Sequence, residues 1–333
     1  LFKTKNIEIS YFELNILGCG SALPTTRHLA SSQIVDLRDK LYMIDCGEGT
    51  QVQMRRMRIK FSRLNHIFIS HLHGDHCFGL PGLISTLGML GRNGDLFIHG
   101  PKELGTYLDA MLQLFCQGLP FHVQFNPVNT QEHALIMEDR SVSVYSIPLK
   151  HRIPCCGFLF KEKQRDAHII REMIDFYQIP VKDIQYIKQG ADYITPEGKC
   201  IPNHLLTRPA TPARTYAYCS DTAYLPEIIP YIRQVDLLYH EATFKDADAA
   251  RAAAQVEDAR RDLVPCPFDH QFAQALSICA RDQHGFIDPE GQAVKIPFPQ
   301  DVGQRLAVQA AVAQQVGVVH GRVVQIDVAP FRS

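Results

Sequence analysis

The sequence predicts an α/β fold in which short strands alternate with helices. The chain of 333 residues is 46% hydrophobic, which suffices for one large α/β domain or two smaller ones. Short apolar runs alternate with segments whose apolar residues recur every three or four positions. Several predicted strands end just before a histidine or an aspartate. Because ligands of α/β folds bind at the carboxyl ends of strands, we expect a functional site at that edge.

The predicted elements follow one another along most of the chain. Apolar runs predict strands at 11–17, 32–37, 41–45, 66–70, 95–101, 121–126, 141–149, 215–219 and 234–239. Helical spacing predicts helices at 47–57, 79–90 and 102–115. These elements form a predicted core of residues 1–246.

Two regions depart from this alternation. Residues 161–214 hold a charged helical stretch at 166–177 and then turn-like pieces, so we interpret them as an inserted arm. Residues 247–333 contain no Tyr, Thr, Asn or Met. We expect this C-terminal part to complete the fold, with a helix-like run at 303–315 and then a short strand.

Charge and composition limit the classes of partner. The net charge is −1, so a nucleic-acid partner requires a local basic patch. No run of 18 apolar residues and no signal-peptide core are visible in the sequence, so we expect no membrane partner. The ten cysteines form no CxxC pair, which indicates reduced thiols and a cytoplasmic location.

The stretch FISHLHGDHCFG, residues 68–79, carries the strongest chemical signal. His71 and His73 are alternate residues of an extended segment and therefore project to the same side. Asp75 and His76 follow where the chain turns into a helix. Imidazole and carboxylate together are typical ligands of zinc, with manganese as the alternative. The motif therefore predicts two adjacent metal pockets.

Three later strands also end in side chains that can bind metal. His151 follows in "PLKH", Asp221 in "SDT" and His240 in "YHEAT". An aspartate at such a position can bridge two metals through its two carboxylate oxygens.

These segments, together with "LGCGSALPTTR", "IDCGEGTQ" and "HEAT", resemble the ribonuclease Z family of the metallo-β-lactamase superfamily over residues 13–246. The resemblance implies a four-layer αβ/βα sandwich with an inserted arm and two zinc ions per chain. It implies that His71, His73 and His151 hold one metal and that Asp221 bridges to the second, which Asp75 and His76 also bind.

The last ligand of the second metal is left open by the resemblance. The GHFSxRY-like segment that carries it in the family is absent, as is the family's GHST segment. His320 in "VGVVHGR" is the nearest analogue, His270 and His284 are rivals, and a site without this ligand is the remaining alternative.

The resemblance also implies a reaction, namely removal of the 3′ trailer from precursor tRNA. We expect Asp75 to accept a proton from the attacking water and His240 to protonate the leaving oxygen, with Glu241 orienting His240. Asp45 is expected to order the metal loop and Ser21 to contact a nucleotide. The family pattern further implies a homodimer and an arm that grips tRNA.

Two other functions compete with this one. The first is hydrolysis of a small phosphodiester, thioester or lactam by the same fold. The second is a catalytically silent RNA-binding protein that has lost its second metal site.

Overall fold

The computed structural model describes residues 12–20, 29–223, 225–242, 294–297, 306–313 and 320–323, with only the backbone described for 242 and the last three ranges. The chain divides into two compact units. The first consists of residues 1–160 and 215–333, and the second of residues 161–214.

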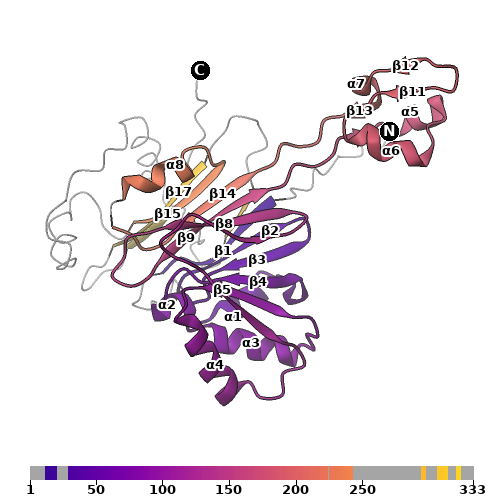
Figure 1. Cartoon of the computed structure of the whole chain (residues 1–333). Coiled ribbons are helices and arrows are strands. Elements are labelled where there is room, and N and C mark those ends of the chain that lie inside the picture. The colour runs from indigo at the N-terminus through magenta and orange to yellow at the C-terminus, as the bar shows by residue number, and fades with distance from the viewer. Residues whose placement is uncertain are drawn as a thin grey trace, which may run out of the picture. The chain divides into compact units, whose positions relative to one another are not determined.

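The first unit contains two seven-stranded sheets (Figure 1). The first sheet has the order β16-β1-β2-β3-β4-β5-β6. Its strands β3 to β6 are parallel, while β1 pairs antiparallel with both β16 and β2. The bounds are β16 Val294–Pro297, β1 Phe12–Gly18, β2 Ser32–Leu37, β3 Lys40–Ile44, β4 Leu64–Phe68, β5 Leu96–Gly100 and β6 Val123–Pro127.

The second sheet has the order β18-β17-β15-β14-β9-β8-β7. Its bounds are β18 His320–Val323, β17 Leu306–Ala313, β15 Leu237–Ala242, β14 Thr215–Cys219, β9 Cys156–Glu162, β8 Val142–Pro148 and β7 Leu135–Glu138. Strands β14, β15 and β17 are parallel neighbours, so their carboxyl ends share one edge.

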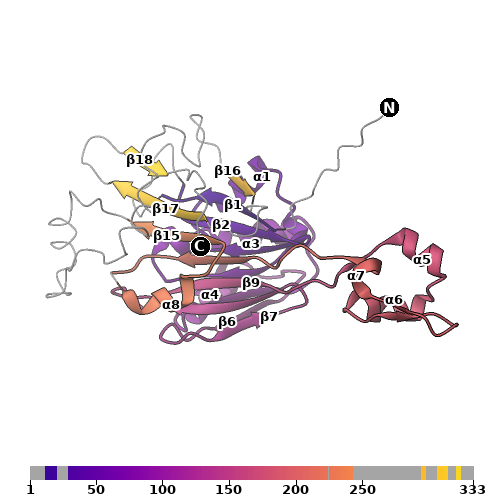
Figure 2. The same ribbon diagram turned by 90° about the horizontal axis from the view of Figure 1, so that it is seen from above.

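Alternation of side chains along the strands builds a layered core. One buried cluster joins the facing sides of the two sheets and includes Phe68, Phe158 and Tyr216. A second cluster packs the outer side of the first sheet against helices, and a third lies under α8 on the second sheet. The helices of this unit are α1 Thr50–Arg56, η1 Phe61–Arg63, α2 Gly74–Cys77, α3 Leu80–Met89, α4 Leu104–Phe115, η2 Pro226–Ile228 and α8 Ile229–Ile232. The result is the four-layer αβ/βα arrangement, seen from a second side in Figure 2.

The second unit has a small core of its own, in which Ile187, Tyr193 and Leu206 are buried. Its elements are β10 His168–Ile169, α5 Arg171–Tyr177, α6 Val181–Lys188, β11 Tyr193–Ile194, β12 Cys200–Ile201, α7 Asn203–Leu206 and β13 Thr207–Arg208. None of the helices in the described part of the chain has the length and apolar character needed to cross a bilayer.

One expected element is wrong. The alanine-rich run at 303–315 was predicted to be helical, but residues 306–313 form strand β17, in parallel register with β15. Helix propensity is a weak prior, and pairing with the edge of an existing sheet overrides it here. Strands β7 and β9 were also absent from the expected set.

Candidate metal centre

The metal loop begins where the buried strand β4 ends. Its backbone is tied to neighbouring segments, because the amide of Cys46 donates to the carbonyl oxygen of His76 at 2.8 Å and the amide of Cys156 donates to that of Ser70 at 3.1 Å. Gly47 is required for this packing, since a Cβ there would lie 2.4 Å from the carbonyl oxygen of Asp75. The loop is therefore held in place by the "DCGEG" segment.

Four side chains converge on one point. Ligand atoms of His71, His73, His151 and Asp221 all lie within 4.8 Å of one another. Nε2 of His71 is 3.0 Å from Nδ1 of His73, and Nε2 of His151 is 3.3 Å from the same nitrogen. Oδ2 of Asp221 lies 3.8 Å from His71 Nε2 and 3.9 Å from His151 Nε2. A zinc ion about 2.0–2.1 Å from each tetrahedral ligand separates the ligands by about 3.3 Å, so these spacings suit such an ion.

A second group of ligands shares Asp221. Its Oδ1 lies 3.7 Å from Nε2 of His76, which is 3.5 Å from Oδ2 of Asp75. Glu241 on β15 joins His76 and Asp221 as the third member of a compact group. Asp221 thus presents one carboxylate oxygen to each group.

The donor set fits divalent cations. Oδ1 of Asp221 is buried and has no hydrogen-bond partner among the described residues, which is a costly state for a carboxylate oxygen. Burial lowers the pKa of His71 to about 2, so its imidazole is neutral and offers a lone pair. A cation between these groups satisfies both the oxygen and the nitrogens.

Asp45 orders the loop from behind. It is fully buried, and it accepts hydrogen bonds from the Ser70 amide at 2.8 Å, the Ser70 hydroxyl at 2.9 Å, the Tyr218 hydroxyl at 2.7 Å and Nδ1 of His76 at 2.7 Å. Burial opposes protonation of His76, but the Asp45 carboxylate outweighs it and raises the pKa of His76 to about 10. Because Nδ1 donates to Asp45, Nε2 is the atom left for a metal.

His71 is oriented through the same network. Its Nδ1 lies 3.0 Å from the Ser70 hydroxyl, which bonds Asp45 and also contacts the Ser220 hydroxyl at 3.0 Å. One buried carboxylate therefore orients two histidines. A single sequence carries no signal for Ser70, Ser220 or Tyr218 in this role.

Glu241, rather than His240, is grouped with the described ligands. Burial and the neighbouring charge of Asp221 raise the pKa of Glu241 well above its ordinary value. His240 donates from Nδ1 to the main-chain carbonyl oxygen of Glu241 at 2.7 Å. The Glu241 carboxylate is thus directed at Asp221, and the main-chain oxygen of the same residue orients His240.

Arg152 is a further residue of this site that the sequence did not indicate. Its Nε and terminal nitrogen lie 3.1 and 2.9 Å from Nε2 of His73. The exposed guanidinium brings a positive charge to the edge of the centre.

The remaining site residues expected from the sequence have no described side chain. Ser21, His270 and His284 are not among the described residues. The backbone of His320 opens strand β18, opposite Ala313 of β17, and its side chain is not described.

Known proteins are similar to this chain in sequence and in fold. A family model described as "Anti-Pycsar protein Apyc1" matches residues 12–165. A ribonuclease Z of Parabacteroides distasonis is 70% identical over 260 residues, which cover 78% of this chain and 86% of that protein. The chain belongs to the ribonuclease Z family. A second ribonuclease Z, from Bacteroides thetaiotaomicron, is 65% identical over 241 residues, covering 72% of this chain and 76% of the relative.

A solved structure of the family agrees with the fold. The short form of human tRNase Z superposes with a TM-score of 0.51 at 25% identity, and the match covers 73% of this chain and 82% of that one. The ribonuclease Z fold and the metallo-β-lactamase architecture expected from the motifs are therefore confirmed.

Proposed function

We propose that this chain is a zinc-dependent endoribonuclease that removes the 3′ trailer from precursor tRNA and leaves a 3′-hydroxyl on the tRNA. The observation that carries the proposal is the convergence of His71, His73, His151 and Asp221 on one point in a chain 70% identical to a ribonuclease Z. The matching family supplies the substrate class, and the side-chain cluster supplies the chemistry.

Two zinc ions per chain are proposed. His71, His73 and His151 would hold the first, while Asp75 and His76 would hold the second, with Asp221 shared between them. Glu241 is the described candidate for the remaining ligand, and His320 is the candidate proposed from the sequence. Three neutral imidazoles at one pocket favour zinc over manganese. When bound, such a metal pair supplies a hydroxide near neutral pH and neutralises charge on the phosphoryl oxygens.

The side chains around the pair would handle the protons. Asp75 is partly exposed and lies beside His76, so it is placed to accept a proton from the attacking water. His240 is proposed to protonate the leaving oxygen through Nε2, since its Nδ1 is engaged by the Glu241 carbonyl oxygen. Arg152 is placed to bind a non-bridging oxygen of the scissile phosphate.

The direct test is cleavage of a precursor tRNA followed by mapping of both new ends. Metal-depleted protein is expected to be inactive and to regain cleavage when zinc is added. A product with a 3′-phosphate, or cleavage at scattered positions, would contradict the proposal.

We also propose a cytoplasmic location and a homodimer. None of the eight described cysteines is in a disulfide, which suits the reducing cytoplasm where precursor tRNA is made. The ends of α3 and α4 expose Met89, Leu114 and Phe115, consistent with a homodimer contact on this side of the first unit. Light scattering of the purified chain measures the assembly.

A further inference from the structure

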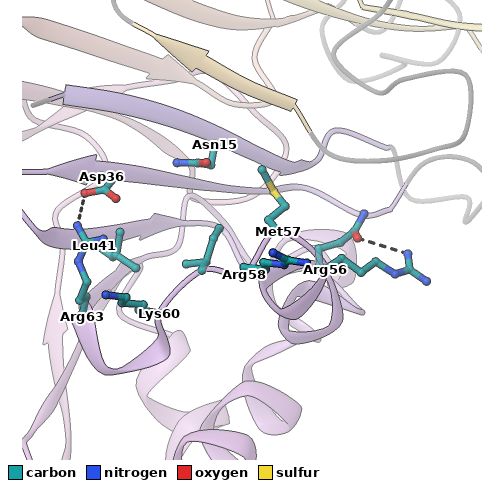
Figure 3. Close-up of a pocket in the computed structure, with 10 residues that line it drawn as sticks. Asn15, Asp36, Leu41, Arg56, Met57, Arg58, Lys60 and Arg63 are labelled. Atoms are coloured by element: carbon teal, nitrogen blue, oxygen red, sulfur yellow. Dashed lines mark hydrogen bonds and ion pairs between the residues drawn. The ribbon is translucent and has the colours of Figure 1, made fainter. Parts of the chain in front are cut away.

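A hollow lies on the outer side of the first sheet, and none of the described metal ligands lines it. It has an empty volume of about 920 Å³, including space open to solvent. Its lining combines cations, two amides and apolar side chains (Figure 3). The lining residues are Asn15, Asp36, Leu41, Gln53, Arg56, Met57, Arg58, Ile59, Lys60 and Arg63.

The floor of this hollow is polar where a helix-covered sheet is normally apolar. Asn15 and Gln53 are buried, with 6% and 2% of their surface exposed, and both line the hollow. Helix α1 ends at Arg56, and residues 57–60 and 63 after it form the rim. Asn15 of strand β1 and Gln53 of helix α1 therefore present amide groups to the hollow.

The rim carries unmatched positive charge. Asp36, the acidic residue of the lining, is paired with Arg63, which also donates to the carbonyl oxygen of Asp39 at 2.7 Å. Arg56, Arg58 and Lys60 are exposed and form no ion pair with any described residue. The pair formed by Arg63 neutralises Asp36 and leaves Arg58 and Lys60 in the lining without a described ion pair, while Arg56 donates to Oε1 of Gln53 at 3.3 Å (Figure 3).

Arg58 lies in the turn that ends helix α1. Its φ of 56° is the left-handed conformation common just after a helix, and the turn is closed by hydrogen bonds from the amide of Arg58 to the carbonyl oxygen of Arg55 at 3.0 Å and from the amide of Ile59 to that of Met54 at 2.9 Å. This cap fixes where the chain leaves the helix and joins the lining of the hollow.

We infer that this hollow binds one nucleotide of the RNA substrate. Arg58 and Lys60 would contact its phosphates, Asn15 and Gln53 would hydrogen-bond the base, and Met57 and Ile59 would pack on the base plane. The inference rests on the proposed ribonuclease function. The lining of the hollow shares no residue with the described metal ligands. Leu41 of the lining lies near the start of strand β3, and Asp45, which orders the metal loop, follows the end of that strand, on the order of 13 Å away at 3.3 Å per residue.

The test replaces the two rim cations and measures how kcat/KM for precursor tRNA depends on salt. Arg58→Asn is combined with Lys60→Gln, because asparagine accepts the left-handed backbone. The matched control combines Lys102→Gln with Arg140→Gln, two exposed cations outside the hollow. Loss of two phosphate contacts lowers the slope of log(kcat/KM) against log[salt] by about 1.4. The control is expected to keep the wild-type slope.

Four further outcomes separate the inference from the proposed function. Hydrolysis of bis-p-nitrophenyl phosphate is expected to be equal in all variants, since the metal ligands are untouched. An unchanged slope in the rim variant, with cleavage intact, overturns the inference alone. Absence of precursor cleavage by the wild type overturns the proposed function. Saturable UMP binding that the rim variant loses while its RNA slope is unchanged identifies a free-nucleotide site and also overturns the inference.

Discussion

Nδ1 of His76 donates a hydrogen bond to Oδ2 of Asp45 at 2.7 Å, and this contact fixes which nitrogen of His76 faces Asp221. The carboxylate that accepts it belongs to the segment after strand β3, 31 positions earlier in the chain. The geometry of the second metal pocket therefore depends on a residue that does not itself bind metal.

Replacement of Asp45 by asparagine is expected to weaken metal binding about 10- to 100-fold, because an amide nitrogen in place of Oδ2 presents hydrogens to the three donors on that oxygen and releases the orientation of His76. The buried unpaired donors also lower the free energy of unfolding by about 2–4 kcal/mol. Competition with a zinc chelator and urea unfolding measure the two effects.

Tyr218→Phe is the matched control for Asp45→Asn. It removes one donor to the same carboxylate but leaves the charge and the His76 contact in place. A loss of about 1 kcal/mol in unfolding free energy with unaltered zinc affinity is expected. If Asp45→Asn and Tyr218→Phe lose zinc affinity equally, Asp45 affects zinc binding only through the overall stability of the protein.

The contact between half-buried His66 and buried His99 predicts how stability depends on pH. Nδ1 of His66 lies 3.1 Å from Nε2 of His99, and burial lowers the pKa of these residues to about 4 and about 3. The folded state therefore favours the neutral rings, whereas the unfolded chain titrates near the ordinary value of about 6.5. Their stabilising contribution is complete above pH 6.5 and is lost as pH falls toward 4, by about 1–3 kcal/mol per pH unit.

His99→Phe removes one of the two titrating rings while keeping the stack on Phe68. The unfolding free energy of this variant, with metal removed, is expected to fall less steeply between pH 6.5 and 4 than that of the wild type. His122→Gln changes an exposed histidine and should keep the wild-type slope. Parallel curves for all three proteins would show that the pair does not control acid stability.

The proton donor is tested by comparing His240→Ala with Glu241→Gln. If His240 protonates the leaving oxygen, His240→Ala lowers kcat about 10²- to 10⁴-fold and removes the fall in rate at high pH, where a general acid loses its proton. Glu241→Gln is expected to change zinc content first, since that carboxyl groups with Asp221 and His76. If Glu241→Gln loses kcat while keeping its full zinc content, and His240→Ala stays active, then Glu241 rather than His240 is the proton donor.

The sequence could predict much of this fold and of the candidate site because both follow from local patterns. Apolar runs that end in His151 or Asp221 indicate strands and place ligands at one edge. Contacts such as Tyr218 with Asp45 depend on how two sheets stack, which no local pattern records. The run at 306–313 shows that a local pattern can also mislead. Its alanines favour a helix, but pairing with the neighbouring strand β15 makes it a strand.

The pairing of Arg152 with His73 was equally out of reach from the sequence. It joins residues 79 positions apart and depends on a side chain that no motif singled out. Glu241 was expected to contact His240, its neighbour in sequence, whereas its carboxyl groups with Asp221 and His76. Neighbours on a strand project to opposite faces, so adjacency in sequence was a poor guide to contact there.

The central claim is that Asp221 links two metal pockets that together cleave precursor tRNA. The most direct measurement is the zinc content per chain of wild type and Asp221→Ala, taken with precursor cleavage by the same samples. The account predicts two zinc ions per chain and precursor cleavage for the wild type. It predicts fewer than two zinc ions per chain and no cleavage for Asp221→Ala. Full zinc occupancy and undiminished cleavage in Asp221→Ala would contradict it.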